Sequence, residues 1–191
     1  MGKLYHYCTV ETLKCILQYK TLRLADIRKS NDSKEINYLF EKYAEWASKN
    51  KNINVNAFLV DQKIQLENTV FLVSCFSRKE DDLHMWSCYA NKGVCVEFYE
   101  DLLEKYIDRI HYGLTEEFKK MNVDINMPCL HISDVNYHND TSINTYFNNV
   151  FKVKQEEYDF AEILFESPYI KSDFFKSEEE VRIVNIYFRS F

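Results

Sequence analysis

Two glutamates and an arginine near the carboxyl end of the chain carry the clearest potential for chemistry. Glu178, Glu180 and Arg182 alternate along a run whose apolar part is typical of a β-strand. Side chains two residues apart on a strand point to the same face, so these three are expected to lie together. Neighbouring carboxylates oppose one another's ionisation, which suits one of them to act as a base, and an arginine can orient them or bind phosphate. The alternative is an exposed acidic edge, because Glu178-Glu179-Glu180 is also a plain charged run.

Two aromatic side chains form a second candidate set. Trp86 and Tyr89 lie three residues apart in a short helix that Asp81-Asp82 is expected to open. Residues at that spacing share a helix face, so the two rings could form a stacking platform for a base or a nicotinamide. Packing in the core is an equal alternative for Trp86, because large aromatic side chains are usually buried.

His6 lies in an expected first strand, Leu4 to Tyr7. It is either a ligand for a hydroxyl group or a hydrogen-bonded core histidine, and the sequence favours neither. The tyrosines on either side point to the opposite face, which favours packing roles for them. Arg23 alternates with leucines in Thr21–Leu24, and it faces either a cleft, where it would suit a pyrophosphate, or solvent.

The cysteines do not form a recognisable metal site. Cys75, His84, Cys88 and Cys95 fit no standard zinc spacing, and Cys75 lies in an apparent buried strand. We therefore predict no metal. A nucleophilic role for Cys75 or Cys8 is also disfavoured, because a free cysteine is commonly a small buried hydrophobe.

The composition limits the class of protein. The chain has 191 residues, 46% of them hydrophobic and 16% aromatic, which is ample material for a core. With three glycines and two prolines, it contains neither a dinucleotide fingerprint nor a P-loop. The net charge of −6 disfavours nonspecific binding to nucleic acid or anionic membranes. No signal segment or membrane-length apolar run occurs, so we expect a cytoplasmic protein with reduced thiols.

The order of elements predicts one mixed domain over residues 1–191. Asp32 followed by Glu35 resembles a capping box and begins the clearest helix, whose apolar stripe continues to Ala47. Strands are expected at 4–7, 21–24, 70–76, 94–98, 130–137 and 181–186, and helices from about residues 9, 32, 55, 82, 102 and 143, the last continuing toward Pro168. The predicted fold class is α+β, with a central, mostly antiparallel sheet of short strands and flanking helices.

Short motifs in a shared order resemble a bacterial family catalogued as domain of unknown function 2971. The motifs are Leu4-Tyr5-His6-Tyr7-Cys8-Thr9, Thr21-Leu22-Arg23-Leu24, Asn31-Asp32-x-x-Glu35, Ser74-Cys75-Phe76-Ser77, Met85-Trp86-x-x-Tyr89, Gly93-Val94-Cys95 and Glu178-x-Glu180-x-Arg182. Two positions depart from the family pattern: Ser33 replaces a usual proline, and Phe175 replaces a usual tryptophan. Neither change removes a candidate chemical group. Asn31, Asp32 and Glu35 are better explained as a helix cap than as site residues.

The layout is more loosely similar to ADP-ribosyltransferases, which have a His-Tyr on the first strand, a serine in a middle strand and a late Glu-x-Glu. The resemblance implies cleavage of NAD at the nicotinamide–ribose bond, by transfer or hydrolysis, and a role as a toxin or phage-defence effector. It implies Glu180 as the first choice of catalytic carboxylate and Glu178 as the second, with His6 on a ribose hydroxyl. The residues that it implies for cofactor binding are Tyr7, Arg23, Ser74, Ser77, Trp86, Tyr89 and Arg182.

Two other classes of function fit the same residues. A non-catalytic module could hold a nucleotide or an RNA end in the same cleft, because aromatic platforms beside an arginine suit base stacking. A protein-interaction domain would use the motifs only as structure. For the enzyme, the expected partners are a nucleotide-type small molecule and a protein or nucleic-acid acceptor, with no membrane.

Overall fold

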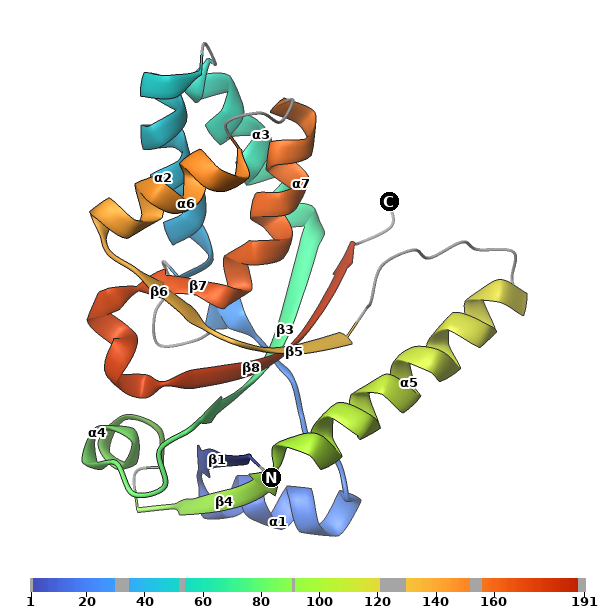
Figure 1. The fold of residues 1–191 in the computed structure, drawn as a ribbon. Helices are drawn as coiled ribbons and strands as arrows, with labels where there is room; N and C mark the ends of the chain where they lie inside the picture. The colour runs from blue at the N-terminus through green and yellow to red at the C-terminus, as the bar shows by residue number, and fades with distance from the viewer. Residues whose placement is uncertain are drawn as a thin grey trace. The chain divides into compact units, whose positions relative to one another are not determined.

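The computed structural model describes residues 2–29, 35–51, 54–90, 92–120, 130–151 and 156–188. It confirms the predicted α+β class, because the chain contains both helices and a sheet whose assigned strand pairs are antiparallel (Figure 1). The chain divides into two compact units, each assembled from three separate stretches. The expectation of one domain over the whole chain stays a prediction.

The first unit comprises residues 1–25, 73–134 and 177–185 and contains most of a six-stranded sheet. Its strands are β1 (Lys3–Cys8), β3 (Thr69–Ser77), β4 (Val94–Tyr99), β5 (Leu130–Asp134) and β8 (Glu180–Phe188), in the order β4-β1-β3-β8-β5. The short β2 (Ala25–Asp26) pairs with β3. Strand β1 is antiparallel to both β3 and β4, and β5 is antiparallel to β8. Strand β3 is therefore a central strand, as its long apolar run predicts.

Three helical segments belong to this unit. Helix α1 (Val10–Tyr19) starts at Thr9, whose side chain accepts a hydrogen bond from Thr12 N, as predicted. Helix α4 (Leu83–Met85) continues directly into the π-helical segment η2 (Trp86–Ala90). Helix α5 (Glu100–Lys120) follows β4 without a connecting loop.

The alternation of β1 divides the core of the first unit between the two faces of the strand. Leu4 packs with Phe76, Val181 and Ile183 on one face. Tyr5 and Tyr7 pack with Met85 and Ala90 of the α4–η2 segment on the other. Burying apolar surface of this kind contributes about 25 cal/mol per Å². The second cluster consequently fixes the α4–η2 segment against the sheet.

The second unit comprises residues 26–72, 135–176 and 186–191 and is mainly helical. Its elements are η1 (Ile27–Lys29), α2 (Glu35–Asn50), α3 (Val55–Asn68), β6 (Asn136–His138), α6 (Asp140–Val150), α7 (Glu156–Glu166), η3 (Ser167–Tyr169), β7 (Ile170–Ser172) and most of η4 (Asp173–Glu178). Strands β6 and β7 form a separate parallel pair. Figure 1 shows α2, α3, α6 and α7 gathered in one cluster.

Aromatic rings fill the centre of this helical cluster. Tyr43 of α2 is almost fully buried and contacts Trp46, Phe58, Phe147 and Phe151. These residues come from α2, α3 and the end of α6, so the rings join segments that are far apart in the sequence. The predicted apolar stripe of α2 is confirmed.

Four expectations about elements differ from the structure. Residues 21–24 form no strand, although Leu22 and Leu24 pack against the Leu4 cluster as the alternation predicts. The stretch 130–137 contains two strands, which pair in different sheets on either side of the buried Val135. The helix from residue 143 does not run on to Pro168, because α6 ends at Val150 and α7 is a separate helix.

Helix α1 is the fourth difference. The spacing of its apolar residues predicts a packed face, yet none of its residues is buried, and Leu17 is 68% exposed. The helix contacts β4. The predicted cap at Asp32 lies outside the described residues. Over the part of the chain that the structure describes, no helix has the length and apolar character needed to cross a bilayer.

Candidate functional site

The two glutamates of the closing motif are held in different ways. Glu180 is the first residue of β8, whereas Glu178 ends the 3₁₀ helix η4, so they do not alternate along one strand. Glu179 between them has a φ of 43°, a left-handed conformation that is uncommon outside glycine. Both outer carboxylates are buried and Glu179 is exposed. The reading of a wholly exposed acidic edge is therefore wrong for Glu178 and Glu180.

The end of β3 fixes this turn. Ser77 Oγ donates to the backbone oxygen of Glu178 at 2.6 Å, and Arg78 N donates to the backbone oxygen of Glu179 at 3.0 Å. Ser77 Oγ also accepts a hydrogen bond from Lys79 N at 3.1 Å. The hydroxyl of Ser77 is therefore hydrogen-bonded to the backbone on both sides of the turn. The hydrogen bonds from Ser77 and Arg78 hold the backbone at Glu178 and Glu179 and so maintain the unfavourable φ of Glu179.

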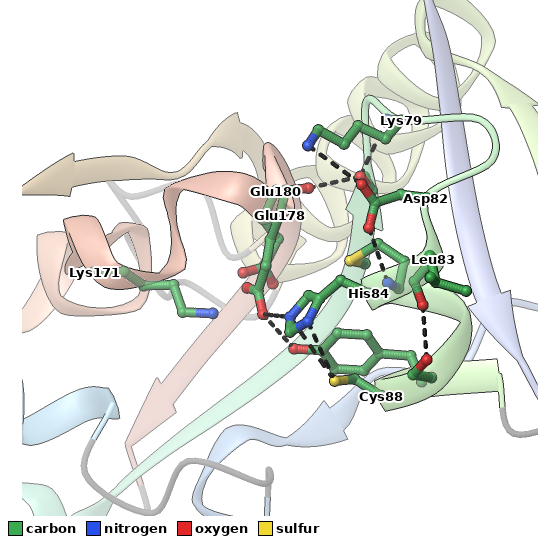
Figure 2. Close-up of polar contacts among 12 residues, drawn as sticks. Lys79, Asp82, Leu83, His84, Cys88, Lys171, Glu178 and Glu180 are labelled. Atoms are coloured by element: carbon green, nitrogen blue, oxygen red, sulfur yellow. Dashed lines mark hydrogen bonds and ion pairs between the residues drawn. The ribbon is translucent and has the colours of Figure 1, made fainter.

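The Glu178 carboxylate faces the α4–η2 segment. It is 2% exposed, and Tyr89 Oη donates to its Oε1 at 2.7 Å. His84 Nε2 lies 3.8 Å from the same oxygen, and Cys88 Sγ lies 3.7 Å from His84 Nδ1. Figure 2 shows the imidazole between the carboxylate and the sulfur. A buried acid is thus in contact with two side chains that reach the surface, Tyr89 and His84, and the second of these contacts the exposed Cys88.

The Glu180 carboxylate has a different partner. Arg182 Nε donates to Oε1 at 2.8 Å, and Arg182 Nη2 donates to Oε2 at 2.9 Å. The arginine side chain is 2% exposed and that of Glu180 is 5% exposed. A bidentate pair of this kind satisfies both oxygens of the acid in a buried place, where an unpaired charge would be costly.

The loop between β3 and α4 is anchored by Tyr7. The Tyr7 hydroxyl lies 2.8 Å from the backbone oxygens of both Lys79 and Glu80, and it accepts from Asp82 N at 3.2 Å. Burial raises the pKa of the Tyr7 phenol, which keeps it protonated and able to donate. Tyr7 is thus placed as a structural residue, in agreement with its packing face.

The start of α4 is capped by Asp82. Its Oδ1 accepts from Met85 N at 3.1 Å, and this backbone hydrogen bond lowers the pKa of the carboxyl group. Trp86 Nε1 donates to Asp81 Oδ1 at 2.7 Å, and its ring meets Tyr7 edge-on at 5.2 Å. Trp86 is therefore half-buried against the sheet, whereas Tyr89 is 38% exposed.

His6 is half-buried and lies beside β3. Its Nδ1 lies 2.8 Å from the backbone oxygen of Cys75, and its ring centroid is 5.5 Å from that of Phe76. Because a carbonyl oxygen only accepts, the Nδ1 of His6 carries the proton. Burial lowers the pKa of the imidazole, although the hydrogen bond opposes the shift. These contacts suit a neutral, structural histidine.

The remaining predicted residues are scattered. Ser74 is buried in β3, and its hydroxyl has no hydrogen-bond partner among the described residues. Arg23 is exposed in the segment before β2. Among the ten residues proposed from the sequence, the structure brings Glu178 into contact with Tyr89 and Ser77. It also pairs Glu180 with Arg182 and Tyr7 with Trp86.

Two members of the cluster, His84 and Cys88, were not expected at the site. Their spacing of four residues predicts that they share a helix face, which was the available signal. The acid that meets His84 comes from a segment about ninety residues away, and no local pattern indicates it. Within the described stretches, no group of three or more His, Cys, Asp or Glu side chains is arranged to hold a metal ion.

A cavity of about 370 Å³ lies elsewhere, in the second unit, and is lined by residues of η1, α2 and α3. It contains none of the predicted site residues.

Comparison with known proteins gives one match. A family model described as "Protein of unknown function (DUF2971)" matches residues 85–183, just over half of the chain. The matched stretch includes Trp86, Tyr89 and the closing Glu-x-Glu-x-Arg. No curated protein and no solved structure matches.

Proposed function

The chain belongs to this family of unknown function, and we propose that it cleaves the nicotinamide–ribose bond of NAD at a site centred on Glu178. The observation that carries the proposal is the buried Glu178 carboxylate, held by Tyr89 at 2.7 Å beside the exposed His84. Departure of nicotinamide leaves positive charge on the ribose, and a fixed carboxylate stabilises such charge as it develops. Nicotinamide is a good leaving group, so neither a strong acid nor a metal is needed.

The contacts favour Glu178 over Glu180 as the catalytic carboxylate. Both oxygens of Glu180 are occupied by Arg182, and neither side chain reaches the surface. Glu178 instead contacts side chains that are open to solvent, so a ligand seated on them would lie next to its carboxylate. Glu180 and Arg182 then act by holding the start of β8, which follows the turn at Glu179.

The neighbouring side chains supply the other groups that the reaction requires. The Tyr89 ring is partly exposed and suits stacking on the nicotinamide. His84 suits a hydrogen bond to a ribose hydroxyl, the role that the resemblance to ADP-ribosyltransferases implies for His6. The ADP-ribose is transferred to water or to a protein or nucleic-acid acceptor. An activity of this kind, which consumes NAD, would suit a toxin or phage-defence effector.

The test is nicotinamide release from NAD by the purified chain and by Glu178→Gln. We expect the variant to lose about 100-fold or more of the rate, because a single group that stabilises charge in the transition state commonly contributes that much. Glu179→Gln is the matched control: it removes the adjacent acid, which is exposed, and is expected to keep the parental rate. Circular dichroism checks that each variant is folded.

The outcomes are distinct. Full activity in Glu178→Gln overturns the assignment of the carboxylate. No release by the parent, with or without a cell extract that supplies acceptors, overturns the reaction itself.

A second candidate is a non-catalytic module that binds a nucleotide or an RNA end. The observation that favours it is the hydrogen bond from Tyr89 to Glu178, which leaves the aromatic ring at the surface and the acid inside. Stacking on such a ring is worth about 1–3 kcal/mol per base. Binding that survives Glu178→Gln and is lost in Tyr89→Ala, without turnover of any nucleotide, would support this candidate.

A further inference from the structure

Cys88 and His84 form a close pair on one face of the α4–η2 segment. Cys88 Sγ lies 3.7 Å from His84 Nδ1 and 3.8 Å from Nε2, so the thiol is in reach of the imidazole. Both side chains are exposed to solvent. A thiol must lose its proton before it reacts as a nucleophile, and a neighbouring imidazole can take that proton.

A buried acid supports the imidazole from the other side. His84 Nε2 lies 3.8 Å from Glu178 Oε1, and Tyr89 Oη holds that same oxygen at 2.7 Å. The carboxylate is therefore fixed where it stabilises positive charge on His84 once the imidazole has accepted a proton. The imidazole lies between the sulfur and the carboxylate (Figure 2), as in sites where a histidine takes the proton of a nucleophilic cysteine and a third side chain orients the histidine.

We propose that Cys88 is a reactive thiol, with His84 as its proton acceptor, that exchanges with small-molecule disulfides to form a mixed disulfide. The Cys88 sulfur attacks one sulfur of the disulfide, a new sulfur–sulfur bond forms, and the other half leaves as a thiolate. The proton from Cys88 passes to His84 and then to the departing thiolate. Cys88 is oxidised to the disulfide level and the leaving half is reduced to a thiol, so no further oxidant is required.

The proposal is independent of NAD chemistry and needs only the three side chains. Because the cluster places the reactive sulfur at the surface, a small disulfide can reach it without a change of fold.

The same chain supplies a matched control in Cys15. Cys15 is also exposed and also lies on a helix, α1. Within the described stretches it has no hydrogen-bond or ion-pair partner. A comparison of the two thiols in one molecule removes differences in concentration, buffer and reagent.

The experiment follows the reaction of the reduced, folded protein with an aromatic disulfide that releases a coloured thiolate. Peptide mass mapping of samples alkylated at successive times assigns the rate to each cysteine. We expect Cys88 to react at least about tenfold faster than Cys15 at neutral pH. His84→Gln should remove this advantage, and His131→Gln, which changes an exposed histidine on β5, should not.

Two results in the comparison of rates would overturn the proposal, and a third comes from the Cys88→Ser variant. One is a Cys15 rate equal to that of Cys88 in the parent. The other is an unchanged Cys88 rate in His84→Gln. In Cys88→Ser the fast phase should vanish, and persistence of that phase would place the reactive thiol elsewhere. Because His84 and Cys88 are both exposed, these variants are expected to fold like the parent, and circular dichroism checks this.

Discussion

His6 illustrates how one residue type serves either structure or chemistry according to its contacts. Its ring lies beside Phe76, and its Nδ1–H is donated to a backbone oxygen. Because burial lowers the pKa of the imidazole, the folded chain holds His6 neutral where the unfolded chain would begin to protonate it. The stability of the protein should therefore depend on the charge of this side chain.

We predict that His6→Gln weakens the loss of stability on acidification. The folded state binds fewer protons at His6 than the unfolded state, so its contribution is complete above pH 6.5 and is lost as the pH falls from there through the lowered folded pKa. Gln can donate the same hydrogen bond but does not titrate. Urea unfolding of the parent and of His6→Gln at several pH values between about 7.5 and about 5 measures how the free energy of unfolding changes with pH. Histidines titrate within roughly this range.

The matched control for His6 is His131→Gln, because His131 is exposed on β5. Burial also lowers the pKa of His138, so His6→Gln should keep part of the loss of stability on acidification. Parallel pH dependence of the parent and His6→Gln would show that His6 is not held neutral.

The residues of the site were partly predictable. Glu178, Tyr89 and Trp86 are named by motif and spacing, because paired acids and aromatics at helical spacing are visible in a sequence. Which of the two acids faces the α4–η2 segment was not predictable, since it depends on the pairing of Arg182 with Glu180 and on the φ of Glu179. No glycine marks that left-handed residue, and it is stabilised by Ser77 at the end of β3 and by Arg78 directly after it.

At the scale of elements, the connection from β3 to α4 positions the candidate site. Tyr7 reaches this loop from β1 and contacts three backbone groups through one hydroxyl, while its ring packs on Trp86. Arg78, at the start of the loop, makes ion pairs of 2.7 Å with both Glu100 and Asp134. The loop is thus tied to β1, α5 and β5, and it carries α4–η2 toward Glu178.

We predict that Tyr7→Phe lowers the free energy of unfolding by roughly 1–3 kcal/mol, because three part-buried backbone groups lose their partner while the ring keeps its packing. Urea unfolding gives the value. Tyr19→Phe removes a hydroxyl at a 63% exposed position of α1 and should change the free energy by less than about 0.5 kcal/mol. An equal effect of the two changes would mean that the Tyr7 hydroxyl does not anchor the loop.

Helices and strands were predictable where the apolar pattern within the segment was enough to distinguish a helix from a strand. The stripe of α2 and the apolar run of β3 are long enough to specify helix and strand without further information. In contrast, residues 130–137 read as one strand, because their apolar pattern does not show that the strands on either side of Val135 pair with different partners. Residues 21–24 have the alternation of a strand but no ladder. The periodicity of apolar residues can be read from a segment alone, whereas the strand with which it pairs depends on the rest of the fold.

At the scale of the whole molecule, both compact units are discontinuous in the sequence. The first joins residues 1–25, 73–134 and 177–185, and the second is built from the intervening stretches. The family match over residues 85–183 covers parts of both. It leaves out β1 and β3, which lie between β4 and β8 in the sheet. The matched stretch is therefore not a structural unit.

We accordingly predict that a fragment of residues 85–183 does not fold on its own. Without β1 and β3, strand β4 has no neighbour in the sheet, and β5 retains only the start of β8. Two short strands alone are marginally stable at best, and the apolar residues that pack on Leu4 and Phe76 would be exposed. Circular dichroism during urea titration should show a cooperative transition for the full chain and none for the fragment. A cooperative transition in the fragment would instead mean that the residues shared by the family hold their own core, and that the strands before residue 85 are additions to it.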